Sequence, residues 1–235
     1  MRGLSPIRYF AVVSPPAAPL VAVLVILAAG AAVLEIIDRG SSDWVLASIG
    51  LLQLFACSTG FARHATRGYY DPLLLLAASH RRRVALAHFA VSSAPGIGAW
   101  IAAGAAQAIA ARSPTVPAFR PAGWVGLLLV SAVPWAAGIR VPRFVAGALW
   151  LTLTASLAVS GKLLVPLSLL HSRPSWAVEH PFRSLAVGLA FPVVLPSLDW
   201  PPAVLLGFSL VGIAALAVGI EMVAAAEFAL AEEDG

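Results

Sequence analysis

Long apolar runs constrain this chain more than any other feature. A helix needs about 20 apolar residues to cross the roughly 30 Å of hydrocarbon in a bilayer, and such runs recur along the 235 residues. They predict spans at about 17–37, 44–62, 84–111, 122–139, 144–164 and 203–228. The sequence therefore predicts an all-α integral membrane protein, a helix bundle of about six transmembrane helices.

The remaining segments are assigned from the same runs. Residues 1–16 are expected to lie at the membrane interface, residues 17–230 to form the transmembrane domain, and residues 231–235 to be an acidic tail. Residues 182–198 are apolar but short, and two prolines interrupt them. A run of this kind predicts a short re-entrant or interfacial hairpin before the last span. If it crossed the membrane instead, the count would be seven and the C-terminus would change side.

The composition argues against a water-soluble fold. Hydrophobic residues make up 60% of the chain and charged residues 11%, with a mean hydropathy of +0.91. A soluble domain has about 45–50% apolar and about 25% charged residues, because polar groups must cover its surface. The net charge is +4, but the arginines separate apolar runs rather than gather on one polar face. We therefore expect no nucleic-acid binding.

The arginines also indicate an orientation, because short cytoplasmic loops collect positive charge. With six spans and a cytoplasmic N-terminus, nine basic residues lie inside and six lie outside. The preference for arginine over lysine, together with the abundance of alanine, is typical of a GC-rich bacterium. We expect a multi-pass protein of the bacterial inner membrane, with its N-terminus in the cytoplasm.

The connector between the second and third predicted spans has the most distinctive residues. Gly68 permits a sharp turn, and Asp71 before Pro72 is typical of a helix start, with an N-cap acceptor followed by proline. Apolar turns follow, and Ser79 is a candidate second cap at the start of the third span. These features predict an amphipathic helix within 67–83 on the cytoplasmic surface. The alternative is a positively charged loop that only sets the topology.

This connector resembles that of the ATP-binding-cassette type-2 exporter permeases. It has their order of a basic residue and glycine, an acidic residue, a leucine pair, and a serine–arginine step that opens the third helix. The six-span count, the proline-rich N-terminal approach and the short hairpin before the last span also resemble this family. Two positions depart from its pattern, since Thr66-Arg67 and Ala77-Ala78 stand where members often have a glutamate and a proline.

The resemblance implies that residues 67–83 form a coupling helix, which docks into a groove of a separate ATPase subunit. The residues then expected to contact the ATPase are Gly68, Tyr69, Asp71, Leu74 and Arg81. The implied partners are a cytosolic P-loop ATPase subunit, which holds ATP and Mg, and a second permease copy or a related permease. This chain has no phosphate-cradling glycine-rich loop of its own, so we expect neither a cofactor nor ATP hydrolysis in it.

Polar residues within the predicted spans are further candidates, because burying a charge in lipid is costly. Glu221 in the sixth span and Gln53 in the second span are candidates for a transport path. The competing interpretation of Gln53, and of Gln107 in the third span, is an interhelical hydrogen bond. The five histidines, His88 among them, are expected at the membrane interfaces rather than in a metal or haem site.

Two functions remain at this stage. The first is the membrane-spanning permease subunit of an ATP-driven exporter, which couples ATP hydrolysis by a separate subunit to substrate movement. The second is a non-transporting membrane anchor or assembly subunit of a larger membrane complex. An intramembrane enzyme would need catalytic residues that converge at one depth, and the sequence has no such set. We therefore expect no catalytic site, no metal site and no enzymatic activity in this chain.

Overall fold

The computed structural model describes residues 26, 30, 46, 48–54, 56–57, 78–113, 116–140, 175–181, 183 and 200–225. Among these residues the regular structure is helical and no strand occurs, which confirms the expected all-α class for this part of the chain. The α-helices are α5 (Ala78–Ala111), α6 (Pro121–Arg140), α9 (Trp176–Glu179) and α11 (Pro202–Ala225), with the 3-10 helix η1 (Pro117–Phe119).

Three of these helices are long and apolar enough to cross a membrane, and they indicate a membrane protein. The span-length segments are Arg81–Ala111, Pro121–Ile139 and Pro202–Ala225. They correspond to the third, fourth and sixth predicted spans. The described residues leave out the fifth span, the first span except residues 26 and 30, most of the second, the hairpin 182–198 except residue 183, and both terminal segments. The count of six spans therefore stays a prediction.

The boundaries of the three helices differ slightly from the prediction. The third span was expected to begin at Val84, but α5 is helical from Ala78, because long arginine side chains reach the interface without ending a helix. α6 and α11 each begin one residue before the predicted start, at Pro121 and Pro202. Proline suits a first helical position, because the N–H that it lacks would have no intrahelical partner there.

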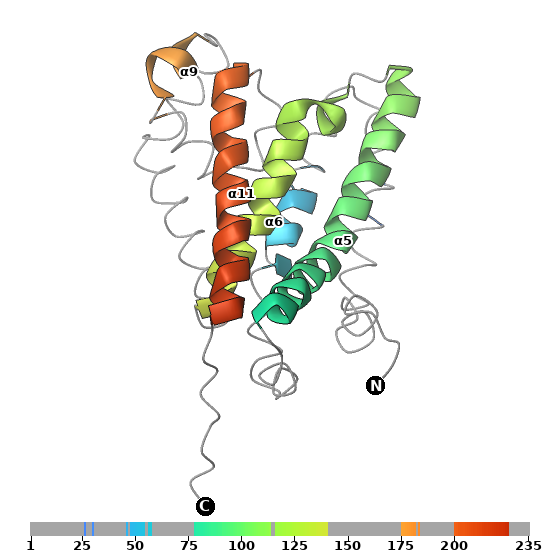
Figure 1. Ribbon diagram of the computed structural model, residues 1–235. Coiled ribbons are helices and arrows are strands. Elements are labelled where there is room, and N and C mark those ends of the chain that lie inside the picture. The colour runs from blue at the N-terminus through green and yellow to red at the C-terminus, as the bar shows by residue number, and fades with distance from the viewer. Residues whose placement is uncertain are drawn as a thin grey trace, which may run out of the picture.

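The three long helices run in two directions. In Figure 1, α5 runs upward, while α6 and α11 run downward and lie side by side. Gly212 and Gly219 allow α11 to approach α6 closely. A Cβ at position 212 would lie 2.8 Å from the Leu128 side chain, and one at position 219 would lie 2.5 Å from the Trp135 ring. Small residues at such contacts are typical of helix packing in membranes.

The second predicted span contributes helical residues to the centre of the bundle. Positions 46, 48–54, 56 and 57 are helical, and Figure 1 shows them in blue between α5 and α6. Leu46, Ile49 and Leu54 are buried in one apolar cluster with Trp100 of α5 and Leu127 of α6. This cluster holds the second span, α5 and α6 together over the middle of the bundle.

The connection from α5 to α6 packs back into the bundle. Trp100 Nε1 donates a hydrogen bond to the Ala118 carbonyl oxygen at 3.0 Å, and Ala118 in η1 is fully buried. Gly104 of α5 and Gly123 of α6 lie against η1, where an added Cβ would come within 2.8 Å and 2.7 Å of Ala118 atoms. The upper ends of α5 and α6 are therefore joined through η1.

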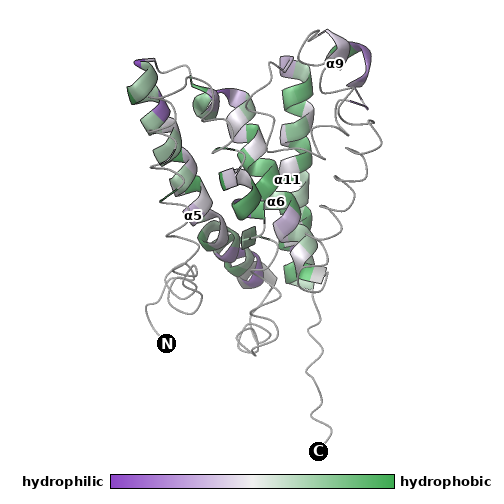
Figure 2. Cartoon of the chain, turned by 180° about the vertical axis from the view of Figure 1, so that it is seen from behind, coloured by the Kyte–Doolittle hydropathy of each residue, from purple (hydrophilic) through white to green (hydrophobic). Residues whose placement is uncertain are grey.

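Arginines stand near the ends of the long helices. α6 has 20 residues, about 30 Å at 1.5 Å per residue, which matches the hydrocarbon thickness. α5 has 34 residues, about 51 Å, which is enough to pass through both headgroup layers. Figure 2 shows hydrophilic residues towards the two ends of α5 and a mostly hydrophobic middle. The basic residues at these ends are Arg81, Arg82, Arg83 and Arg140 below, and Arg112 and Arg120 above.

Candidate functional site

The predicted site residues that the structure describes fall into two separate polar sites. Arg81 and Glu221 lie where the lower ends of α5 and α11 meet, and Gln53 lies inside the bundle. The other predicted coupling residues, Gly68, Tyr69, Asp71 and Leu74, lie outside the described residues.

The first site joins the start of α5 to the end of α11. Arg82 Nη2 lies 2.9 Å from Glu221 Oε2, and Arg81 Nη1 donates to the Ala224 carbonyl oxygen at 3.5 Å. Ala224 is in the last turn of α11, where the final carbonyls have no partner within the helix. We call this site the arginine junction and define it by Arg81, Arg82, Arg83, Glu221 and Ala224.

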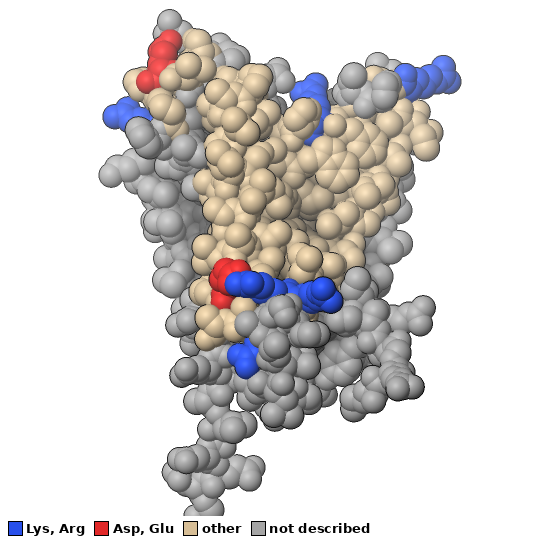
Figure 3. Space-filling view, viewed as in Figure 1, with Lys and Arg blue, Asp and Glu red and all other residues tan. Residues whose placement is uncertain are grey.

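The arginine junction is a surface contact. The Arg82 and Glu221 side chains are 54% and 57% exposed, and Figure 3 shows acidic and basic atoms side by side at the lower end of the described surface. An ion pair this exposed contributes little to stability. Glu221 contacts a neighbouring helix, α5, through Arg82. Its role in a transport path stays a prediction.

The second site is a buried hydrogen-bond centre around Gln53, whose side chain is 1% exposed. Gln53 Nε2 donates to the Ser93 carbonyl oxygen of α5 and to Ser131 Oγ of α6, each at 3.0 Å. A third contact of 3.5 Å runs to the sulfur of Cys57, one turn further along the same span. Gln53 thus makes the interhelical hydrogen bonds of the competing interpretation, while its role in a transport path stays a prediction.

Side-chain donors of the second span reach the backbone of α5 next to a proline. Pro95 lies inside α5 and has no N–H, so the Val91 carbonyl oxygen, four residues earlier, lacks its usual helical donor. The carbonyl oxygens of the next two residues, Ser92 and Ser93, receive Cys57 Sγ at 3.9 Å and Gln53 Nε2 at 3.0 Å.

Gly96 supplies the space for this arrangement. A Cβ at position 96 would overlap the Gln53 side-chain amide, so the amide can enter α5 only where the helix has no side chain. Gln53 Oε1 is buried on this side and has no hydrogen-bond partner in the described part of the chain. Gly96 therefore provides the space that the Gln53 amide occupies beside the α5 backbone.

His88 is buried between helices. Its side chain is 1% exposed, and its Nδ1 accepts a hydrogen bond from Trp135 Nε1 of α6 at 3.0 Å. This contact depends on the rotation of α5 about its axis, which no local pattern in the sequence reports. The expected depth of His88, at a membrane interface, stays a prediction. The sequence reasoning likewise missed Ser93 and Ser131 as hydrogen-bond acceptors.

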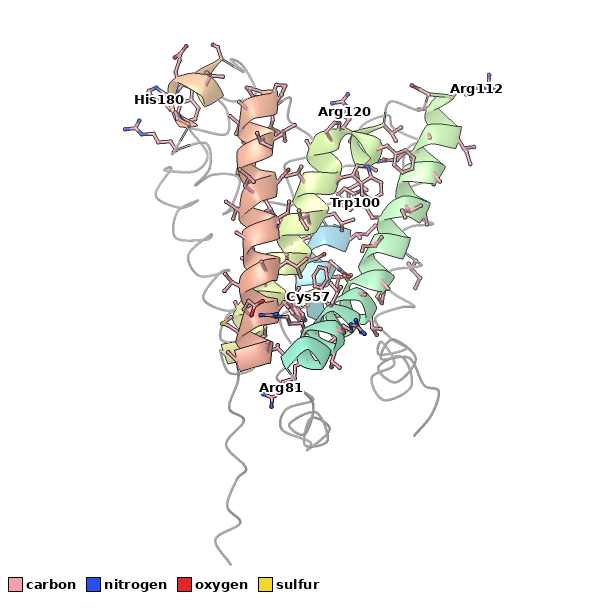
Figure 4. All side chains as sticks on the ribbon, viewed as in Figure 1. Cys57, Arg81, Trp100, Arg112, Arg120 and His180 are labelled. Atoms are coloured by element: carbon pink, nitrogen blue, oxygen red, sulfur yellow. The ribbon has the colours of Figure 1, made fainter. Side chains whose placement is uncertain are left out.

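The two sites lie at different depths. Ser93 follows Arg82 by eleven residues in α5, which is about 16 Å along the helix axis. Figure 4 shows Cys57 among the helices and Arg81 at the lower end of α5. Gln53 is enclosed and Glu221 is exposed, so the described residues do not bring these two path candidates to one surface.

The chain was compared with protein-family models, curated proteins and solved structures, and none of them matches. The fold and the two sites therefore define a broad class only. The described part belongs to a membrane protein with three span-length helices, which a buried amide and an exposed ion pair help to join.

Proposed function

We propose that this chain is the membrane-spanning permease subunit of an ATP-driven exporter, in which a separate cytosolic P-loop subunit hydrolyses ATP. The observation that supports this most is the continuity between the predicted coupling segment and α5. α5 begins at Ala78, inside residues 67–83, so Ser79 lies in its first turn rather than at its cap. The predicted coupling segment and α5 therefore share residues 78–83, and a displacement of those residues would move the start of α5.

Two sets of contacts would pass that displacement on. The arginine junction joins the start of α5 to the end of α11, and Gln53 joins the middle of α5 to the second span and α6. A displacement of the first turn of α5 would therefore reach α11 at the lower end, and the second span and α6 at the centre. Export then requires that substrate bind differently in the inward and outward states of the bundle. A second copy of this chain, or a related permease, would complete the exporter.

The two candidates for the transport path, Glu221 and Gln53, differ in how accessible they are to a substrate. The Glu221 carboxylate is exposed beside Arg82, where a substrate can reach it. The Gln53 amide is enclosed, and a path through it requires α5 and α6 to separate between Ser93 and Ser131. That separation would break both 3.0 Å hydrogen bonds of Gln53. We therefore assign Glu221 to the path in the observed state and Gln53 only to an opened state.

The proposed topology has six spans, with the arginine junction on the cytoplasmic side. α6 ends at the lower end and α11 starts at the upper end, which supports one crossing between them, the fifth predicted span. α9 and the start of α11 lie together at the upper end. This placement of the flanking residues supports a hairpin at 182–198 that returns to its own side. The arginines at the lower end support its cytoplasmic location.

The test is co-purification of an ATPase with the tagged full-length chain, isolated in mild detergent from its native host. The variant Asp71→Arg with Leu74→Glu changes the proposed coupling helix. The matched control is Glu179→Arg with Val178→Glu, which makes the same two kinds of change at exposed residues of α9, at the opposite end of the bundle. We expect a P-loop ATPase with the wild type and the control and none with the coupling-helix variant.

Two results would contradict the proposal. Retention of the ATPase by the coupling-helix variant would remove residues 67–83 from the contact. Absence of any ATPase from all three samples would remove the exporter assignment, and the anchor or assembly subunit would become the better proposal. Size-exclusion profiles of the three samples check that each variant is folded.

A further inference from the structure

The arginine junction has more positive charge than its own acidic residue neutralises. Arg82 and Arg83 are consecutive near the start of α5, and Glu221 is the carboxylate that pairs with Arg82. These two arginines and one glutamate carry a charge of +1. Arg82 and Arg83 are both exposed, so this charge is open to a partner from outside the bundle.

The depth of the junction matches that of lipid headgroups. α5 is about 51 Å long, whereas a bilayer including its headgroups is about 40–45 Å thick. The first turns of α5 therefore extend beyond the hydrocarbon. Glu221 follows Pro202 by nineteen residues in α11, about 29 Å, which places its carboxylate at the other edge of the hydrocarbon. The charged groups thus lie at the level of the phosphates of one leaflet.

Apolar side chains continue from the junction towards the membrane interior. Leu86 follows Arg82 by about one helical turn and is 50% exposed, and Val218 precedes Glu221 by about one turn and is 55% exposed. Because α5 and α11 are antiparallel and meet at Arg82 and Glu221, both apolar residues lie on the membrane side of the ion pair. Acyl chains can pack on them while a headgroup meets the arginines.

We propose that the arginine junction binds an anionic phospholipid, whose phosphate contacts Arg82 and Arg83 and whose acyl chains contact Leu86 and Val218. A net negative headgroup complements the +1 charge, whereas a zwitterionic headgroup brings its own cation to the arginines. The Arg82 guanidinium has five N–H donors, so its pair with Glu221 leaves donors for a phosphate. Glu221 is then an internal competitor for Arg82. This site does not depend on the exporter function.

The test is native mass spectrometry of the full-length chain with equal amounts of phosphatidylglycerol and phosphatidylcholine, read as the ratio of the two bound lipids. We expect phosphatidylglycerol to dominate in the wild type. Arg82→Gln and Arg83→Gln are each expected to lower the ratio about fivefold, the equivalent of about 1 kcal/mol per basic residue at a membrane surface. Arg112→Gln, at the opposite end of α5, is the matched control and is expected to change the ratio less than about twofold.

Glu221→Gln separates lipid binding from a purely structural role of the ion pair. It removes the competitor of the phosphate, so we expect the phosphatidylglycerol ratio to rise. A fall in the ratio for this variant, or an unchanged ratio for both arginine variants, would overturn the proposal. If the arginine variants keep the lipid ratio but lose an ATPase in the co-purification, the patch binds protein and the lipid proposal is wrong. Circular dichroism in neutral lipid shows that each variant is folded.

Discussion

Polar side chains join the helices of this bundle in two regions that differ in depth and charge. At the centre, the neutral amide of Gln53 is 1% exposed and bonds to α5 and α6 at 3.0 Å. At the lower end, the charged groups of Arg82 and Glu221 are 54% and 57% exposed and lie 2.9 Å apart. The buried contact uses neutral groups, and the charged contact lies at the exposed surface.

This difference follows from the cost of desolvation. Moving an ion out of water costs several kcal/mol even after relaxation, whereas a neutral amide costs about 1–3 kcal/mol, which its hydrogen bonds offset. Loss of one hydrogen-bond partner of Gln53 would leave buried polar groups without hydrogen bonds. Breaking the ion pair between Arg82 and Glu221 leaves both charged groups in a polar environment. The central site therefore specifies how the helices pack, while the lower site can open and close at little cost.

The largest expected loss of stability comes from overpacking the contact between α6 and α11. Gly219→Ala places a Cβ 2.5 Å from the buried Trp135 ring, and such overpacking costs about 1–3 kcal/mol. The matched control is Gly98→Ala on the exposed side of α5, where an added Cβ meets no atom within 4 Å. This control should gain up to about 1 kcal/mol from helix propensity. The measurement is the midpoint of unfolding in sodium dodecyl sulfate, and equal shifts for the two variants would contradict the close contact.

The next effect is the coupling between Gln53 and Ser131 in the buried site. Gln53→Met keeps the side-chain volume and removes the donors, and Ser131→Ala removes one acceptor. Each variant should lose about 1 kcal/mol, and the double variant should lose less than the sum by about 0.6 kcal/mol, as is typical of hydrogen bonds between membrane helices. The same unfolding assay measures all three variants. Strict additivity would mean that this hydrogen bond does not hold the helices together.

The smallest effect is expected at the lower region. The double-mutant cycle of Arg82→Gln and Glu221→Gln should show a coupling smaller than that of Gln53 and Ser131, because both charged groups are exposed. This coupling should fall further as the salt concentration approaches 1 M, where the Debye length is about 3 Å. A coupling as large as the central one, or one that salt leaves unchanged, would break the distinction between the two regions.

The sequence predicts the three described spans well, because the bilayer imposes a length that apolar runs must match. The differences lie at the boundaries. The arginines before Val84 predict a span that starts at about that residue, yet α5 already begins at Ala78. The length of hydrocarbon sets the apolar run, whereas the helix itself extends into the headgroup layer. For α6 and α11, the prolines at 121 and 202 belong to the first helical turn.

The sequence could predict the type of interaction at the candidate sites, but not the residues that take part in it. A glutamine within a span indicates an interhelical hydrogen bond, but its partners depend on the depth and rotation of three helices that are far apart in sequence. Ser93 and Ser131 therefore had no signal of their own. The hydrogen bond between His88 and Trp135 depends on the same rotation, and the sequence does not predict it. The pairing of Arg82 with Glu221 joins residues 139 positions apart, which no local pattern reports.

The directions of the three long helices have an electrostatic consequence at the lower end of the bundle. A helix carries the equivalent of roughly half an elementary charge at each end, positive at the N-terminus and negative at the C-terminus. Among the described spans, this end has one N-terminus, from α5, and two C-termini, from α6 and α11. The backbone alone therefore leaves roughly half a negative charge there. Three arginines would disfavour the start of an isolated helix, but here the C-terminal ends of the two neighbouring helices offset a small part of their charge, and would still do so without Glu221.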